Sequence, residues 1–293
     1  TLSSSSAASD VYKRQELELC RAEIRSLREE LDETNRGVVA LYGELDVQAE
    51  KLRKATELKS HFLSYMSHEF RTPIGAIRSN ARLLLDHVDG PLTTEQTRQV
   101  GFIQETAAEF SEMVNDLLDL AKIEAGRLEI SPGWFEMMDL FAALRGMFKA
   151  MADNVELSLV FEEPGDLPRF YTDNRKLSQI LRNFISNALK FTPQGEIKVS
   201  AELVGDMLVK FSVADTGIGI ASEFHDAIFN DFTQVDSPIQ KRLRGTGLGL
   251  ALSKQLAQLL GGWVEVQSAL GEGSTFSVIV PAHLPVDTKD LKA

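Results

Sequence analysis

Apolar side chains recur every seven residues between residues 17 and 55, and this repeat constrains the fold more than any other feature of the sequence. One position of the repeat holds Leu17, Ile24, Leu31, Val38, Leu45 and Leu52, and the position three residues later holds Cys20, Leu27, Thr34, Leu41, Gln48 and Ala55. Six consecutive heptads predict a coiled coil, because the seam is too narrow for a helix on a globular core. A parallel dimer is the expected arrangement, and one long amphipathic helix packed on its own chain is the alternative.

A helical hairpin is expected after the coil, because the apolar spacing changes after Lys59 while the helical period continues. The first helix of the hairpin carries Leu58, Phe62, Met66, Phe70, Ile74 and Ile77. This change is a local stutter in the repeat, and Pro73 predicts a kink. A second helix is expected from Thr94 to Ala125, with Thr93 or Thr94 as its N-cap. Two such hairpins side by side form a four-helix bundle, which a dimeric coil would produce.

An α/β domain is expected beyond Pro132–Gly133, where segments with helical and strand periods alternate. The expected helices are 138–151, 174–190 and 248–260, and the expected strands are 197–203, 207–213, 263–267 and 275–280. The first two strands form a hairpin around Gly205–Asp206, and the last two pair around Gly271–Glu272–Gly273. The predicted boundaries are a non-native or disordered leader (1–15), a coiled-coil helix (16–58), a helical-hairpin domain (59–128), the α/β domain (131–285) and a tail (286–293).

Composition narrows the class of protein. The 293 residues include 31 Lys and Arg against 43 Asp and Glu, a formal net charge of −12. This charge disfavours non-specific binding to nucleic acid or to anionic lipid. The single cysteine excludes a disulfide within the chain, and no apolar run approaches the roughly 18 residues that a membrane-spanning helix needs. A reducing, cytoplasmic compartment is therefore expected.

A candidate reactive histidine lies on the first hairpin helix. If Met66 is the centre of the buried stripe, His68 points to solvent and shares an exposed flank with Glu69 and Thr72. A neutral imidazole is a nitrogen nucleophile, and a neighbouring carboxylate can hold one ring nitrogen protonated and accept a proton. A lone surface histidine is usually only solvated, so the position alone does not establish a function.

The helix predicted over residues 174–190 places Asn183, Asn187 and Lys190 on one face. Amide oxygens are suitable ligands for Mg²⁺, which keeps several waters and bridges nucleotide phosphates, and a lysine offers a compact positive charge. The same three residue types are common on helices that bind nothing.

Two glycine-containing segments follow. Asp215, Gly217 and Gly219 come after a predicted strand, and the glycines predict a tight turn. The carboxylate of Asp215 can accept a hydrogen bond from an exocyclic amino group. The second segment opens the helix of residues 248–260 and comprises Arg244, Gly245, Thr246, Gly247, Leu248 and Gly249. Glycines at a helix N-terminus leave N–H groups free for phosphate oxygens, although Asp–Gly turns and glycine loops are often only loops.

The segment from Ser67 to Pro73 resembles the phospho-acceptor box of sensor histidine kinases, and the asparagine and glycine segments follow in the order found in that family. The resemblance covers about residues 51–281. It implies an all-α coiled coil and dimerisation hairpin, followed by an α/β two-layer sandwich of the GHKL (Bergerat) type. By resemblance, His68 is phosphorylated from ATP, Glu69 is the base and Thr72 assists dephosphorylation.

The resemblance also implies an ATP·Mg²⁺ site, with Asn187 on the metal, Lys190 on phosphate and Asp215 on the adenine amino group. The other implied nucleotide-binding residues are Asn183, Gly217, Gly219, Arg244, Gly245, Thr246, Gly247, Leu248, Gly249 and Thr275. Residues 221–243, with Phe229, Phe232, Lys241 and Arg242, resemble the family's mobile lid, and a plain surface loop is the alternative. The implied partners are a second copy of the chain and a response-regulator receiver on a separate chain, and the chain resembles a fragment of a larger bacterial sensor.

Asn183 separates the kinase from ATP hydrolases that share this fold. Gyrase-, Hsp90- and MutL-like proteins place a glutamate one turn before the metal-binding asparagine, and this chain has an amide there. An amide cannot take up a proton, so transfer to a protein nucleophile is favoured over hydrolysis. A dimeric scaffold that binds ATP without catalysis and a GHKL-type hydrolase remain the alternatives, and Thr72 leaves a phosphatase activity open.

Overall fold

The computed structural model describes residues 3–88, 90–152, 156–163, 165, 167–205, 207–230, 233 and 247–284. The chain divides into two compact units, residues 1–59 and residues 60–293. No helix in the described ranges combines the length and the apolar character needed to cross a membrane.

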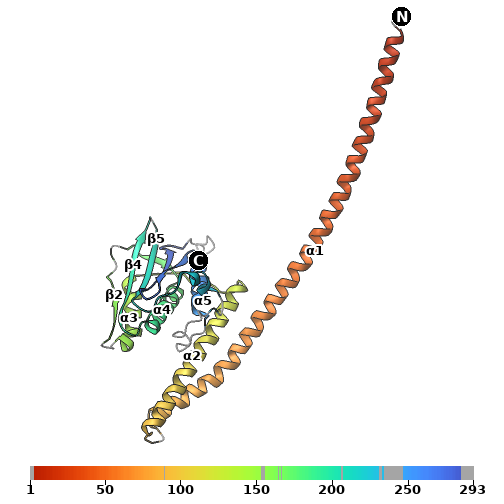
Figure 1. Ribbon diagram of the computed structural model, residues 1–293. Helices are drawn as coiled ribbons and strands as arrows, with labels where there is room; N and C mark the ends of the chain where they lie inside the picture. Colours follow the sequence, from red (N-terminus) through yellow and green to blue (C-terminus); the bar gives the residue numbers. More distant parts are fainter. Residues whose placement is uncertain are drawn as a thin grey trace. The chain divides into compact units, whose positions relative to one another are not determined.

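The first unit is a single helical segment, the N-terminal part of α1 (Ser3–Leu85), drawn in red to orange in Figure 1. The backbone shows no break at residue 16, where the predicted leader ends, and α1 also continues through Pro73. Several heptad side chains are exposed, among them Leu17, Ile24, Leu31, Leu45 and Leu52. These side chains are not covered within the first unit itself, and both the coiled coil and the helix packed on its own chain stay predictions.

The second unit begins with the predicted hairpin of α1 and α2 (Thr94–Glu124). Thr93 is the N-cap of α2: its hydroxyl accepts from the Gln96 backbone N–H over 3.3 Å, and its own N–H donates to the Gln96 side chain over 2.9 Å. This reciprocal capping box satisfies two backbone donors of the helix start. Of the two candidates that the sequence offered, Thr93 is the cap.

Buried side chains in the hairpin recur every seven residues. The seven-residue series comprises Ser67, Ile74 and Ala81 on α1 and Val100, Ala107, Val114 and Ala121 on α2, and Leu118 and Leu120 near the end of α2 are buried as well. Within one chain Ser67 is only 2% exposed whereas Phe62 is 58% exposed, so the side chains buried inside a single hairpin are centred one position beyond Met66. A second apolar stripe lies beside the buried one, and periodicity alone does not separate the two.

The α/β domain contains a five-stranded sheet in the order β2-β4-β5-β7-β6. Its strands are β2 (Leu157–Phe161), β4 (Gly195–Val204), β5 (Leu208–Asp215), β6 (Trp263–Ala269) and β7 (Gly273–Pro281). β2 pairs with β4 in parallel and the other neighbours are antiparallel. Two short strands, β1 (Gly133–Phe135) and β3 (Phe170–Thr172), pair separately. The predicted hairpins are confirmed, whereas β1, β2 and β3 were not foreseen.

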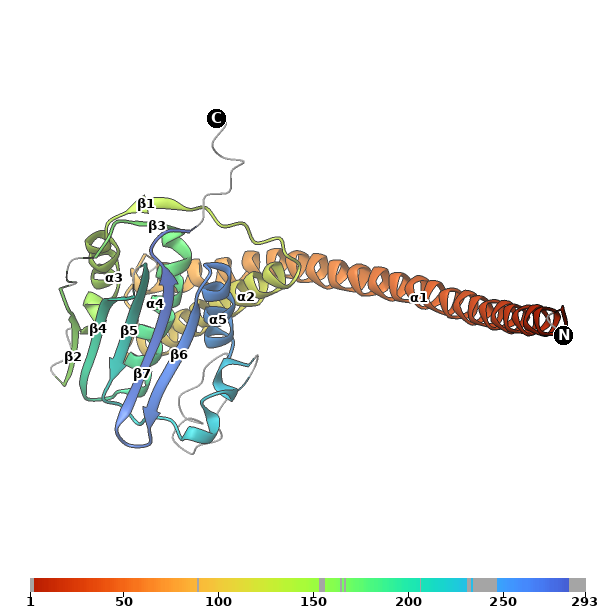
Figure 2. The ribbon, with the colours of Figure 1, turned by 90° about the horizontal axis from the view of Figure 1, so that it is seen from above.

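Three helices cover one face of the sheet, as Figure 2 shows: α3 (Met137–Ala152), α4 (Asn174–Phe191) and α5 (Gly249–Leu259). The core between these layers includes Phe141, Leu144, Phe184, Phe211 and Leu256, and Leu120 at the end of α2 belongs to it. Two short 3₁₀ turns, η1 (Ser222–Phe224) and η2 (Ala227–Phe229), precede α5. The two-layer α/β sandwich predicted from the sequence is confirmed.

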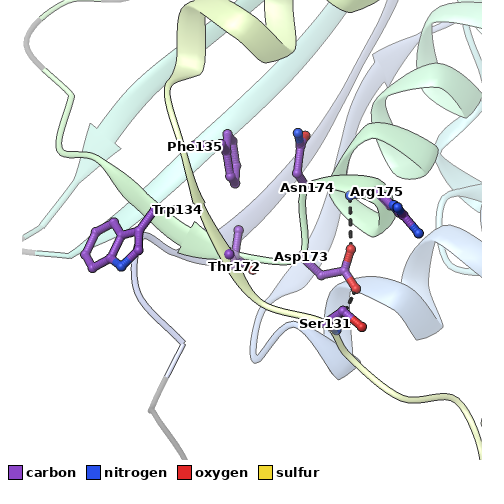
Figure 3. A pocket seen from close by; sticks show the side chains of 8 residues that line it. Ser131, Trp134, Phe135, Thr172, Asp173, Asn174 and Arg175 are labelled. Carbon is purple, nitrogen blue, oxygen red and sulfur yellow. Dashed lines mark hydrogen bonds between the residues drawn. The ribbon is translucent and has the colours of Figure 1, made fainter. Parts of the chain in front are cut away.

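The start of α4 is fixed by Asp173, which lines a surface hollow together with Trp134, Phe135 and Thr172 (Figure 3). One carboxylate oxygen of Asp173 accepts from the N–H of Arg175 over 3.0 Å, and the other accepts from the N–H of Ser131 over 2.9 Å. An aspartate in this place satisfies free N–H groups of the helix start and favours its dipole. Asp173 therefore fixes where α4 begins. It also links the start of α4 to Ser131, in the segment that leads into the domain.

Candidate phosphotransfer and nucleotide site

His68 lies on the solvent side of α1, as predicted, with 76% of its side chain exposed. Its Nδ1 lies 3.6 Å from Oε1 of Glu69, and the hydroxyl of Thr72 donates to the carbonyl of His68 over 3.5 Å. The three polar side chains therefore share one flank. The contact with Glu69 engages Nδ1, which leaves Nε2 as the ring nitrogen directed away from the carboxylate.

Asn183 on α4 contacts α5 directly. Its amide Nδ2 donates to the hydroxyl of Ser253 over 2.9 Å, and a Cβ atom at Gly249 would collide with the Asn183 side chain. Glycine at the start of α5 therefore lets the two helices approach closely. Asn187 follows one turn later on α4 and is half-buried.

Lys190 lies in the last turn of α4, where its ammonium group is 5.5 Å from the centre of the Phe191 ring. Burial lowers the pKa of Lys190, and the carboxylate of Glu109 on α2 opposes this shift. A partly desolvated ammonium group interacts more strongly with an anion than a fully hydrated one does.

Asp215 ends β5 with only 9% of its surface exposed. Its Oδ1 accepts from the N–H of Gly217 over 2.8 Å and from the hydroxyl of Thr192 over 3.4 Å. Burial raises the pKa of Asp215, and the hydrogen bonds from Gly217, Ser274 and Thr192 oppose the shift. These donors hold the carboxylate in one orientation at the edge of the domain.

The loop after Asp215 is held from both sides. The Gly271 N–H donates to the Ile218 carbonyl over 2.8 Å, and the Ile218 N–H donates to the Phe191 carbonyl over 3.3 Å. Gly219 has a φ of +67° and no room for a Cβ atom beside the Ala269 carbonyl. The tight, glycine-dependent turn predicted from the sequence is therefore confirmed at Gly219.

The second glycine segment is described only from residue 247. Gly247 has a φ of +69°, Leu248 is buried and Gly249 is the first residue of α5. The N-cap residue of this helix, Leu248, makes no side-chain capping hydrogen bond. The first N–H groups of a helix have no partner within the helix itself. The candidates Arg244, Gly245 and Thr246 lie outside the described residues.

The expected lid is also described only in part. Phe229 at the end of η2 packs edge-on against Phe276 of β7, with the ring centres 6.4 Å apart. Phe232, Lys241 and Arg242 lie outside the described residues.

The β-ladder places Thr275 and its neighbour Ser274 on opposite faces of the sheet. Asp215 pairs with Ser274, whereas Thr275 pairs with Ala214. Because side chains alternate across a strand, Ser274 shares the face of Asp215 and Thr275 lies on the other face. Thr275 as a nucleotide-binding residue stays a prediction.

Sequence reasoning missed four hydroxyl residues around the site: Thr192, Ser253, Ser268 and Ser274. Each makes a hydrogen bond to a site residue or to its loop. Serine and threonine are frequent in all loops and strands, so a single sequence held no signal that set these four apart.

Two family models match the chain. Residues 58–126 match the His Kinase A (phospho-acceptor) domain, and residues 172–284 match the histidine kinase-, DNA gyrase B- and HSP90-like ATPase. The chain belongs to the histidine kinase family. The two matched domains contain the exposed His68 and the buried Asp215 in the order that the family resemblance implied.

Curated histidine kinases align over most of the chain. The circadian input-output histidine kinase CikA of Synechococcus elongatus is 37% identical over 236 residues, which is 80% of this chain and 31% of CikA. The autoinducer 2 sensor kinase/phosphatase LuxQ of Vibrio harveyi is 36% identical over 242 residues, 80% of this chain and 28% of LuxQ. The chain therefore spans about a third of the length of these relatives.

The solved structure of full-length ShkA in complex with AMPPNP is also similar to this histidine kinase. It has a TM-score of 0.60 and 34% identity, and the match covers 75% of this chain and 45% of ShkA.

The site residues fit an adenine nucleotide. A buried carboxylate at the loop edge suits an amino group, and glycines leave backbone close to the surface where a side chain would block approach. The uncapped start of α5 offers N–H groups for phosphate oxygens.

Proposed function

We propose that this chain phosphorylates its own His68 from ATP and passes the phosphoryl group to an aspartate of a response-regulator receiver on a separate chain. One observation carries the proposal: an exposed imidazole has its Nδ1 3.6 Å from Glu69, on a chain that also holds a buried Asp215 beside a glycine loop. The relatives CikA and LuxQ carry the name of histidine kinase or sensor kinase.

His68 is the nucleophile in this reaction. The lone pair of Nε2 attacks the γ-phosphorus, an N–P bond forms, and the bond from that phosphorus to the bridging oxygen breaks. ADP leaves with the bond's electron pair, and Glu69 accepts the proton released from Nδ1.

ATP supplies the phosphoryl group, and the chain contributes positioning and charge. Asp215 receives the adenine amino group, and Lys190 and the start of α5 receive phosphate oxygens. Most of the catalysis of phosphoryl transfer comes from such placement and from charge neutralisation. Gly217, Gly219, Gly247 and the remaining glycine-segment residues let the nucleotide approach the backbone.

Asn187 would hold Mg²⁺ together with the nucleotide. Among the described residues, no group of three or more His, Cys, Asp or Glu side chains could hold a metal ion alone. An amide oxygen, phosphate oxygens and waters together supply the hard oxygen ligands that Mg²⁺ prefers.

The working form is a homodimer. A second apolar stripe of the hairpin, which we call the outer stripe, is exposed in one chain. It comprises Phe70, Ile77 and Leu84 on α1 and Ile103 and Phe110 on α2, again seven residues apart. Because α1 continues unbroken from the coiled-coil repeat into the hairpin, a second copy paired along the coil is the partner that covers this stripe.

Transfer to histidine is favoured over hydrolysis because Asn183 occupies the place of the hydrolases' glutamate. Its amide donates to Ser253 and cannot take a proton from water. A purely structural ATP-binding dimer, by contrast, has no use for a carboxylate beside an exposed imidazole.

Incubation of the whole chain with γ-labelled ATP and Mg²⁺ tests the proposal. Label that is acid-labile, stable to base and lost in His68→Gln is the expected result. His61→Gln is the matched control, because His61 is an exposed histidine one heptad earlier on the same helix. Nucleotide binding without label would favour the scaffold, and rapid phosphate release would favour the hydrolase.

A further inference from the structure

Ser268 occupies an unusual position among the hydroxyl residues of the domain, because it contacts three residues on two segments of the candidate nucleotide site. Its Oγ donates to the Gly273 carbonyl over 2.8 Å, accepts from the Ile220 N–H over 2.8 Å and lies 2.9 Å from the Ser274 hydroxyl. It therefore joins the loop after Asp215 to the hairpin of β6 and β7.

The proton positions in this cluster follow from counting donors. A serine hydroxyl has one proton and two lone pairs. The Gly273 carbonyl can only accept, so the short contact with it uses the proton of Ser268. The Ile220 N–H takes one lone pair of Ser268, and the remaining lone pair accepts the proton of Ser274. Every hydrogen-bonding position of Ser268 is then filled.

This arrangement leaves Ser274 without a proton to donate elsewhere. Ser274 is buried, pairs with Asp215 across the β-ladder and lies on the same face. Its oxygen can only accept in the direction of the site, as the carboxylate of Asp215 does. Two adjacent acceptors suit a base that carries an exocyclic amino group and oppose a base with a carbonyl oxygen at that place.

We infer that Ser268 is a specificity-determining positioning residue, which selects a 6-amino purine over a 6-oxo purine by fixing the Ser274 hydroxyl as an acceptor. The inference deepens the proposed function, because it concerns the base recognised at the same nucleotide site. Ser268 acts through Ser274 and the loop at Ile220, and it is not a catalytic residue.

The test compares the binding of ATP and of inosine triphosphate, which differ at the 6-position. Dissociation constants are measured by calorimetry on the whole chain carrying His68→Gln, so that no transfer consumes the nucleotide. In Ser268→Ala the Ser274 hydroxyl is free to rotate and donate to a 6-oxo group, and the preference for ATP is expected to fall by about tenfold.

Two further variants separate this role from general destabilisation. Ser268→Thr keeps the hydroxyl and is expected to keep the preference. Ser277→Ala is the matched control, because Ser277 is a buried serine of β7 whose hydroxyl pairs with Ser212 over 2.9 Å, away from the loop. If Ser268→Ala does not fold, Ser274→Ala takes its place, and the preference for ATP is again expected to fall.

Three results decide the matter. Equal weakening of both nucleotides in Ser268→Ala, or no change in their ratio, overturns the inference. A smaller preference for ATP over inosine triphosphate in Ser268→Ala supports the inference. If the chain that keeps His68 is also never labelled by ATP, the inference stands while the proposed function fails. If neither ATP nor inosine triphosphate binds to the His68→Gln chain, both the inference and the proposed function are overturned.

Discussion

Gln179 of α4 donates a side-chain hydrogen bond to the carboxylate of Asp119 on α2 over 3.2 Å, and this bond joins the hairpin to the nucleotide-binding domain. Asp116 lies one turn before Asp119 on α2. Burial, with smaller contributions from the carboxylates of Glu112 and Asp119, raises the pKa of Asp116 to about 7, although Arg182 of α4 opposes the shift. A carboxylate in this contact therefore titrates near neutrality.

The stability of the second unit is expected to decrease as the pH rises through 7. Because the folded state binds the proton of Asp116 more tightly than the unfolded state does, this contribution is fully present below about pH 4 and is lost above the folded pKa. The slope from this one group is at most about 1.4 kcal/mol per pH unit. The free energy of unfolding, measured with denaturant at about pH 5.5 and about pH 8.5, should differ less between the two pH values in Asp116→Asn than in the unchanged chain. An equal difference in both proteins would exclude Asp116 as the source.

Charge in the outer stripe is expected to separate the dimer. Ile103 is 48% exposed on that stripe, and Ile103→Lys places an ammonium group where the partner's apolar side chains pack. Sedimentation should show monomer for Ile103→Lys and dimer for Phe102→Lys, whose parent side chain is 70% exposed but lies off the stripe. The same dimer for both variants would place the interface elsewhere.

Loss of the α2 cap should destabilise the hairpin measurably. Thr93→Ala removes the hydroxyl that accepts from the Gln96 N–H, and such a cap contributes about 1 kcal/mol to the free energy of unfolding. Thr94→Ala changes the same residue type one position later and should cost less than about 0.5 kcal/mol. Chemical denaturation of the two variants measures the difference, and equal effects would argue against the capping box.

Thr72 is expected to act in removal of the phosphoryl group from the partner rather than in phosphorylation of His68. Its exposed hydroxyl lies one turn from the imidazole, where it can orient a water, and the relative LuxQ is named a sensor kinase/phosphatase. Thr72→Ala should slow decay of a phosphorylated receiver by about tenfold or more while label on His68 persists. Restoration by Thr72→Ser is the control, and unchanged decay in Thr72→Ala would remove it from this role.

The sequence was most informative where a period or a motif was long. The coil repeat, α2, α4 and the β4–β5 hairpin each carry many residues that agree on one structure, and the order of the site segments indicated the two domains. The burial of Ser67 within one hairpin and the pairing of Ser274 with Asp215 were not foreseen, because a period defines a pattern without its phase. β1 and β3, at three residues each, are too short for any periodic signal.

The contacts that shape the site depend on tertiary structure. Ser268 meets Ile220 across 48 positions of sequence and Gln179 meets Asp119 across 60. Neither pair stands out by residue type, and only the approach of separate elements brings them together. The sequence therefore suggested which residues form the candidate site, whereas it did not reveal the hydrogen bonds that orient them.

His68 sits in the interior of an unbroken helix, and this fixes which of the two reactants travels. Helical hydrogen bonds on both sides hold its backbone, so the imidazole can only turn about its own side-chain bonds. In the proposed transfer the nucleotide therefore has to reach the imidazole. If the donor domain belongs to the same chain, residues 125–132 connect it to α2, and this connection is held because Leu128 and Ile130 pack on the core and Ser131 donates to Asp173. Transfer within one chain then requires either that these contacts open or that the end of α2 moves with the domain.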